Sequence, residues 1–210
     1  MKPCAEYGDP DAPKVLIQMV DDHDLEGMES EVAEIRKLTD KKFYLIAVKV
    51  QNWNTDLSPW NAPAVFGKEA FEAGAASTLE EVLKLCADQK KIHIIGGYSL
   101  AGLFALWAVY QTNVFAAAAA ASPSVWFPGF IEYMKEHRPQ AASVYLSLGD
   151  KEEKTRNPVM AAVGSRIRDA HELLRGQGVD TVLEWNPGNH FRDADIRTAK
   201  AFAWTMMRAE

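Results

Sequence analysis

The feature that most constrains the fold is a regular alternation of short apolar runs with segments of helical periodicity. The runs predict strands, because each is bounded by turn residues and is too short for a typical helix. They span residues 14–20, 43–50, 91–96, 115–121, 143–148 and 181–185. The expected helices span residues 25–38, 78–87, 100–111, 128–137, 158–176 and 191–208. This alternation predicts an α/β fold, with a mostly parallel sheet and helices on both of its faces.

The composition of the run Phe115–Ala121 is unusual for a strand, because six consecutive alanines favour a helix. We nevertheless predict a strand. The run is short and lies between a helix ending near Asn113 and the turn Ser122-Pro123-Ser124. Small side chains here would also permit close packing beside the neighbouring turn.

Composition limits the class of protein. A chain of 210 residues with 48% hydrophobic content can bury a sizeable core, and we expect one domain over residues 1–210. The net charge of -6 and the lack of a strong Lys and Arg cluster argue against nucleic-acid binding. No apolar run approaches the roughly 20 residues that span a bilayer, so we expect no membrane insertion.

The compartment is predicted from the cysteines and the amino terminus. Cys4 and Cys86 lie far apart and lack the spacing of metal ligands, so we expect free thiols in a reducing compartment. Residues 1–13 contain no apolar segment of signal-peptide length. The sequence therefore predicts a cytoplasmic protein that needs no metal or other cofactor.

The clearest chemical signal is the stretch Ile92–Leu103, IHIIGGYSLAGL, which predicts a strand, a tight turn and a helix with Ser99 at the tip. Such a turn exposes a serine hydroxyl and directs the first amides of the helix at a bound group. The usual G-x-S-x-G pattern is altered, because Ala101 takes the last glycine position and Gly102 follows it. A serine in a purely structural turn is the alternative. A dinucleotide site is disfavoured, because the spacing is not G-x-G-x-x-G.

A serine nucleophile needs a base, and histidine is the usual one. His190 follows the last expected strand, at the edge where ligands bind in a parallel sheet, and we predict that it is the base. His93 lies inside a strand, and His137 and His171 lie on expected helices. His23 is the competitor, but it precedes Ser99, against the chain order serine, acid, histidine of this type of site.

A carboxylate must orient the base, and three acids follow the strand before His190. Asp150 is nearest the strand end, whereas the common Gly-x-x-acid spacing selects Glu152. We prefer Glu152, and Asp150 and Glu153 remain alternatives.

The oxyanion of an acyl-transfer intermediate needs backbone donors. We expect one from the Leu100 amide and one from the loop after the first strand, near Asp22. The neighbouring acidic residues Asp21 and Asp24 are unfavourable beside an anion. Either their side chains point away, or the cluster selects a cationic substrate.

The segment Gln51–Ser77 is the longest stretch without a clear period, and its aromatic content argues against disorder. Trp53 and Trp60 belong to it. They either fill a gap under the loop or line a substrate pocket, and we assign them to the pocket.

Four motifs in this order resemble the esterase branch of the α/β-hydrolases, which includes esterase D-like enzymes and enterobactin-type siderophore esterases. They are GYSLAG at 97–102, ASPSVW at 121–126, GDKE at 149–152 and PGNH at 187–190. The resemblance spans nearly the whole chain from Lys14. It implies an α/β-hydrolase fold with Ser99, Glu152 and His190 as nucleophile, acid and base. The chain itself is compact and begins almost at its first core strand, so we expect no separate lid domain and a shallow, open site. The chain departs from the family after the first strand, where an His-Gly or Asp-Gly pair is common.

The sequence thus predicts a serine esterase that acts on a small-molecule ester through an acyl-enzyme. Acyl transfer at the same site is one alternative, and a non-catalytic binding protein on a hydrolase scaffold is another. The substrate and the oligomeric state are not predicted.

Overall fold

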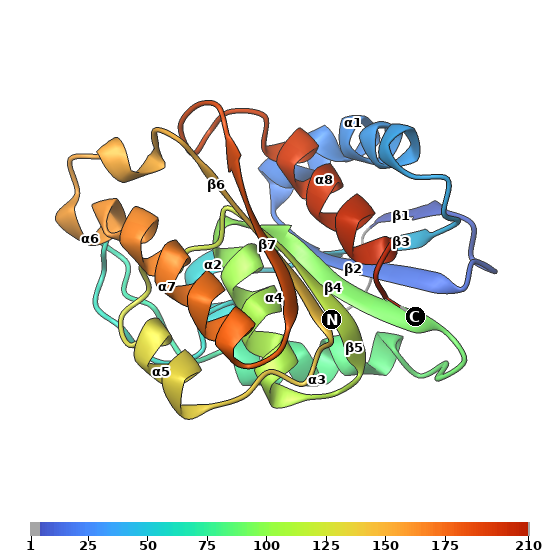
Figure 1. Cartoon of the computed structure of the whole chain (residues 1–210), viewed down its shortest axis with the longest axis horizontal. Helices are drawn as coiled ribbons and strands as arrows, with labels where there is room; N and C mark the ends of the chain where they lie inside the picture. The colour runs from blue at the N-terminus through green and yellow to red at the C-terminus, as the bar shows by residue number, and fades with distance from the viewer. Residues whose placement is uncertain (1–4, 210) are drawn as a thin grey trace.

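The structure is a computed structural model that describes residues 5–209, so Cys4 lies outside the described residues. Within these described residues, seven strands form one sheet in the order β1-β3-β2-β4-β5-β6-β7 (Figure 1). The strands are β1 (Ala5–Gly8), β2 (Lys14–Val20), β3 (Tyr44–Lys49), β4 (Ile92–Tyr98), β5 (Phe115–Ala121), β6 (Ser143–Gly149) and β7 (Asp180–Asn186). Neighbouring strands are parallel except that β1 runs antiparallel to β3. The mostly parallel sheet is confirmed. The edge strand β1 was not predicted from the sequence.

Helices cover both faces of this sheet, as expected (Figure 1). One layer contains α1 (Asp22–Leu38) and α8 (Ala194–Met206), which pack against each other. The opposite layer contains α3 (Ala75–Leu85), α4 (Ser99–Gln111), α5 (Phe130–Glu136) and α7 (Val163–Gly176). Shorter helical segments are α2 (Trp53–Asp56), α6 (Pro158–Ala161) and the 3-10 turn Glu152–Lys154. The carboxyl ends of the parallel strands therefore open at one edge, between the two layers.

The alanine run forms β5, as predicted, and the packing explains its composition. Ala119 pairs in register with Gly96 of β4, and both lie under Phe202 of α8. A Cβ on Gly96 would lie 2.5 Å from the Phe202 ring and 2.8 Å from the Ala119 Cβ. Small residues on both strands therefore allow α8 to approach the sheet closely, and this packing overrides the helical propensity of alanine.

Several helix ends differ from the sequence-based expectation. Helix α1 begins at Asp22 because Asp21 caps it through a reciprocal pair of hydrogen bonds with Asp24. Helix α3 begins at Ala75, three residues before the expected start at residue 78. The preceding Gly74 packs tightly on the Thr55 carbonyl, where a Cβ would lie 2.5 Å from the oxygen. The helix expected over residues 158–176 is interrupted at Ala162, and α8 begins three residues late.

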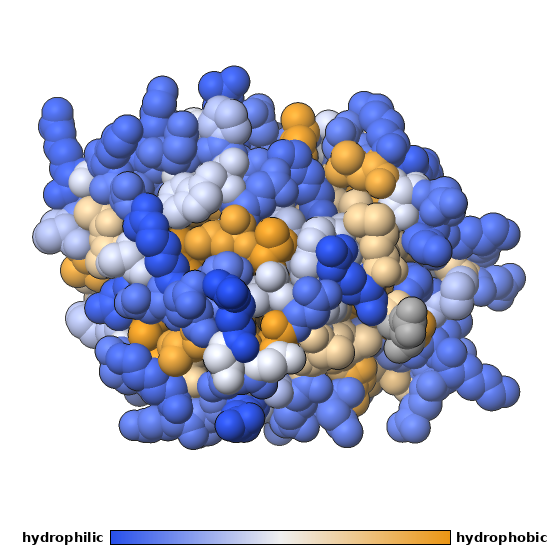
Figure 2. Space-filling model, in the orientation of Figure 1, coloured by the Kyte–Doolittle hydropathy of each residue, from blue (hydrophilic) through white to orange (hydrophobic). Residues whose placement is uncertain are grey.

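The outer faces of the helices are largely polar. In the view of Figure 2, hydrophilic side chains cover most of the surface, and smaller hydrophobic patches lie between them. Within residues 5–209, no helix combines the length and the apolar character that crossing a membrane requires. Cys86 is a free, buried thiol, and burial raises its pKa to about 12.

Candidate active site

Ser99 is the first residue of α4 and directly follows β4, at the carboxyl edge of the sheet. Its φ of +57° places a non-glycine residue in the left-handed region, which costs about 1–2 kcal/mol. Position 97 needs a glycine because Ala101 packs against it: a Cβ on Gly97 would lie 2.7 Å from the Ala101 Cβ. Gly97 thus makes room for Ala101. A Cβ on Gly102 would lie 3.0 Å from the Gly97 carbonyl oxygen, so the next turn of the helix also needs a small residue.

A chain of hydrogen bonds joins Ser99, His190 and Glu152. The His190 Nε2 lies 3.0 Å from the Ser99 Oγ, and the His190 Nδ1 lies 2.7 Å from the Glu152 Oε2. His190 belongs to the loop after β7, and Glu152 opens the 3-10 turn after β6. The three residues come from the ends of three different strands, as the sequence reasoning required.

Glu152 is held as a buried carboxylate. Its side chain is 4% exposed, and its Oε1 accepts hydrogen bonds from the Gly149 amide at 2.7 Å and the Ser122 hydroxyl at 2.9 Å. Burial alone would raise the pKa of Glu152. The hydrogen bond and charge of His190, together with the bonds from Gly149 and Ser122, outweigh burial and hold the pKa below its ordinary value.

The two alternative acids have other partners. Asp150 accepts a hydrogen bond from the Gly188 amide at 2.7 Å and so helps to shape the loop before His190. Glu153 lies 3.4 Å from an Arg168 nitrogen, in an exposed ion pair. Of the three candidates, Glu152 is the one that contacts His190.

The remaining histidines lie elsewhere. His93 is buried inside β4, and its burial lowers its pKa. His23 is exposed on α1, 3.9 Å from the Glu26 carboxylate. Among the described residues, His190 is the histidine that hydrogen-bonds the Ser99 hydroxyl.

Arg197 and Tyr98 complete the buried network, and sequence reasoning missed both. The Arg197 side chain is 1% exposed, and its Nη1 donates to the Glu152 Oε1 at 2.9 Å and to the Tyr98 hydroxyl at 2.9 Å. Tyr98 in turn donates to the His190 carbonyl oxygen at 2.8 Å. The Arg197 Nη2 donates to the Pro187 and Asn189 carbonyls. The sequence feature that could have indicated Arg197 is the position of a charged residue on the apolar face of the last helix.

Ser124 was also missed. Its hydroxyl lies 3.3 Å from the Ser99 Oγ, and its amide donates to the Ser99 carbonyl at 3.0 Å. The second bond ties the turn after β5 to the turn that carries Ser99.

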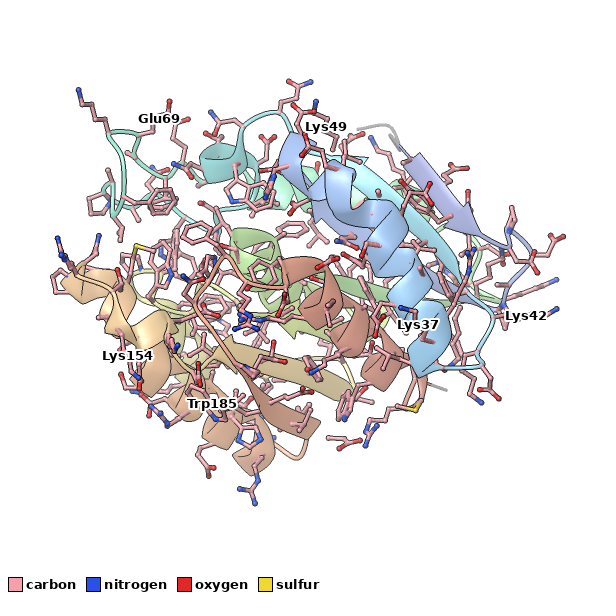
Figure 3. The ribbon with its side chains drawn as sticks, turned by 90° about the horizontal axis from the view of Figure 1, so that it is seen from above. Lys37, Lys42, Lys49, Glu69, Lys154 and Trp185 are labelled. Carbon is pink, nitrogen blue, oxygen red and sulfur yellow. The ribbon has the colours of Figure 1, made fainter. Side chains whose placement is uncertain are left out.

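A cavity of about 600 Å³ opens beside Ser99 and His190. Apolar side chains from several segments line it: Phe66, Trp126, Met160, Val163 and Phe191. Lys154, at the α6 end of the molecule in Figure 3, also lines it. A hydrogen bond from Asn157 to the Val65 carbonyl joins the two segments that form its outer wall.

The two tryptophans expected in this pocket do not line it. Trp60 packs on Phe127, Phe130 and Tyr133, and its indole nitrogen donates to the Pro128 carbonyl at 2.8 Å. Trp53 begins α2 and packs, partly buried, against the same core. Their assignment to the pocket is therefore corrected: both fill space under the loop, and Phe66 and Trp126 are the aromatic residues at the cavity.

The two residues expected to donate to the oxyanion, Leu100 and Asp22, lie at the starts of different helices, α4 and α1. Leu100 follows Ser99 in the first turn of α4, where amides have no partner within the helix. Leu100 is not among the residues that line the Ser99 cavity, and neither is Asp22. Its exposed carboxylate pairs with Lys49, beside the first turn of α1 in Figure 3. The neighbouring Asp21 amide donates to the Asp24 carboxylate at 3.2 Å within the helix cap.

The geometry suits nucleophilic chemistry at Ser99. The hydroxyl lies within hydrogen-bond reach of a histidine, and that histidine is oriented by a carboxylate, which is the arrangement that activates a serine. Among residues 5–209, no group of three or more His, Cys, Asp or Glu side chains could hold a metal ion.

Similar proteins were found among solved structures. No protein-family model matches the sequence, and no curated protein matches it. An IroE-like serine hydrolase from Shewanella oneidensis is 15% identical with a TM-score of 0.70, and the match covers 92% of this chain and 70% of that one. The enterobactin esterase FES from Shigella flexneri is 13% identical with a TM-score of 0.60, over 96% of this chain but 55% of that one.

A third similar structure has nearly the same length. Esterase PE8 is 18% identical with a TM-score of 0.58, and the match covers 98% of both chains. At these identities the likeness is one of fold. The chain therefore has the α/β-hydrolase type of fold that its motifs led us to expect.

Proposed function

We propose that this protein is a serine hydrolase that cleaves carboxylic esters. The observation that carries the proposal is the continuous hydrogen-bonded chain from the Ser99 hydroxyl through His190 to the buried Glu152 carboxylate. The fold shared with esterases and a serine hydrolase gives further support. The apolar cavity next to Ser99 would accommodate a hydrophobic part of the ester.

In the proposed reaction the Ser99 oxygen attacks the ester carbonyl carbon while the His190 Nε2 takes the hydroxyl proton. Glu152 accepts a hydrogen bond from the other ring nitrogen and stabilises the imidazolium. The Leu100 amide donates to the oxyanion of the tetrahedral intermediate. His190 then returns the proton to the leaving alcohol, and water cleaves the acyl-enzyme by the same steps.

The test replaces the proposed nucleophile. We expect Ser99→Ala to lower kcat/KM for p-nitrophenyl butyrate by at least about 10³-fold, as is typical for loss of a serine nucleophile. The matched control is Ser165→Ala, which removes an exposed hydroxyl on α7 and should retain full activity. The proposal also predicts that a fluorophosphonate probe labels Ser99, which peptide mass spectrometry would detect.

Two results would contradict this proposal. One is undiminished turnover by folded Ser99→Ala, which would place the chemistry elsewhere. The other is wild-type protein, folded by circular dichroism, that neither hydrolyses short esters nor reacts with the probe. That result would favour a binding protein on a hydrolase scaffold.

A further inference from the structure

A second cavity, of about 340 Å³, lies next to the Ser99 cavity and meets it at Phe191, which lines both. It is formed by β2, by the first turns of α1 and α8, and by Tyr98 immediately before Ser99. His23 lines it, and its described lining includes no lysine or arginine, although Arg192 pairs with the lining residue Asp193 at 3.2 Å. Five carboxylates line the cavity. They are Asp24, Glu26, Glu31, Asp193 and Asp195.

The wall of this cavity contains buried acceptors that the protein leaves without partners. Gln18 and Glu31 are 3% and 4% exposed, and the Gln18 Nε2 donates to the Glu31 Oε2 at 3.2 Å. Within the described part of the chain, the Gln18 Oε1 and the Glu31 Oε1 accept no hydrogen bond. A buried acceptor without a donor destabilises the protein, so a ligand that brings N–H donors to this wall would remove that cost.

The electrostatics of the same residues favour a positive ligand. Burial is the main reason that the pKa of Glu31 is raised to about 8 and that of Asp24 to about 6, and the neighbouring carboxylates Asp21, Asp24 and Asp195 add to these shifts. The pKa of Glu31 is lowered in part by a hydrogen bond from Gln18, and the pKa of Asp24 by the Asp21 amide and by its electrostatic interaction with His23. A bound cation would stabilise the ionised form of both acids.

The position of the cavity connects it to the reaction. Tyr98 precedes the proposed nucleophile, and Phe191 follows the proposed base. Phe191 is 89% exposed and lines both cavities, so the two cavities border the same exposed residue. One ester molecule could therefore place an apolar part beside Ser99 and a polar end in the acidic cavity.

We infer that the acidic cavity binds a primary ammonium group of the substrate, so that the preferred substrates are esters with an apolar part and a cationic end. This inference rests on the proposed esterase function. The Gln18 and Glu31 oxygens would accept N–H bonds from the ammonium, and Asp24 and Asp195 would supply opposite charge. The acidic cluster that the sequence places after β2 would then select substrate rather than oppose the oxyanion.

The inference is tested with two esters of the same shape, 4-(aminomethyl)phenyl butyrate and 4-ethylphenyl butyrate, in which an ammonium replaces a methyl group. We expect wild-type kcat/KM to be at least about tenfold higher for the cationic ester. Glu31→Gln and Asp195→Asn should each lower this ratio at least about threefold. Both esters are assayed with the same preparation of each variant. A partial loss of folded protein therefore lowers both kcat/KM values equally and leaves their ratio unchanged. Glu29→Gln, an exposed glutamate on α1 outside the cavity, is the matched control and should keep the wild-type ratio.

Binding to Ser99→Ala separates this inference from the proposed function. Calorimetric titration with 4-(aminomethyl)phenol and 4-ethylphenol should show tighter binding of the amine, and Glu31→Gln in the same background should remove the difference. Equal binding of the two phenols, or a wild-type ester ratio near one, would overturn the cation site even if the protein is an esterase. Selective amine binding by a protein that hydrolyses neither ester would keep the site and overturn the proposed reaction.

Discussion

At the scale of single residues, the two oxygens of the Glu152 carboxylate have different partners. One oxygen faces His190, and the other accepts bonds from Gly149, Ser122 and Arg197. Three donors on one oxygen fix the plane of the carboxylate, and this plane sets the orientation of the imidazole. Arg197 also holds the loop before His190 through two carbonyls, so it positions both the acid and the base.

We predict that Arg197→Met is more damaging than an exposed-charge substitution on the same helix. Removing one partner of a buried ion pair typically costs about 3–5 kcal/mol. Urea denaturation should therefore show a large loss of stability, and kcat for p-nitrophenyl butyrate should fall at least about tenfold. The control is Lys200→Met, which removes a half-exposed ion pair with Glu184 and should change stability by less than about 1 kcal/mol. Equal effects of the two substitutions would contradict a positioning role for Arg197.

At the scale of elements, the ends of β6 and β7 are joined so that the acid and the base meet. The Asp150 amide donates to the Asn186 carbonyl, and the Lys151 amide donates to the Gly188 carbonyl. Gly149, the last residue of β6, packs directly against the Gly188 carbonyl of the loop after β7. A Cβ there would lie 2.4 Å from the Gly188 carbonyl oxygen and 2.9 Å from the Glu152 Oε1. The junction therefore depends on the absence of a side chain.

We predict that Gly149→Ala moves the loop that carries His190 away from Glu152. A misplacement of about 1 Å can cost roughly 10²-fold in rate, so kcat/KM for p-nitrophenyl butyrate should fall about 10–100-fold. The comparison is Gly176→Ala at the end of α7, where a Cβ would meet nothing within 4 Å. That variant should keep full activity. Wild-type activity in Gly149→Ala would mean that the junction tolerates the added methyl group.

At the scale of the whole molecule, two cavities of opposite character open at the carboxyl edge of the sheet. The larger is mainly apolar and contains Ser99, and the smaller is acidic and lies toward α1 and α8. The net charge of -6 adds to the local field of the acidic cavity. This combination should attract a cationic ester at long range.

We predict that the preference for the ammonium ester depends on salt. The Debye length falls from about 30 Å at 0.01 M to about 10 Å at 0.1 M ionic strength, so attraction by exposed carboxylates weakens over this range. The kcat/KM for 4-(aminomethyl)phenyl butyrate should fall about threefold, whereas that for 4-ethylphenyl butyrate should change little. Parallel salt profiles for the two esters would argue against electrostatic selection of the substrate.

The sequence by itself determined the sheet, the strand-turn-helix around Ser99 and the chain order of the candidate groups. These features are local, because strand and helix periods and glycine positions act over a few residues. The alanine strand β5 could be placed by its length and its turns, although its composition favoured a helix. The short edge strand β1 could not, because its four residues alternate in exposure over too short a run to be recognised as a strand.

Only the tertiary structure decided which side chains meet. Ser99 and His190 are 91 residues apart, and Arg197 reaches Glu152 across 45 residues. The Gly-x-x-acid spacing favoured Glu152 but left Asp150 and Glu153 as alternatives, and no local pattern could place Arg197 behind Glu152. Trp53 and Trp60 were misplaced for the same reason, because the lining of a cavity depends on how distant loops pack. The pairing of Gln18 with Glu31, and with it the acidic cavity, arises where α1 closes over β2.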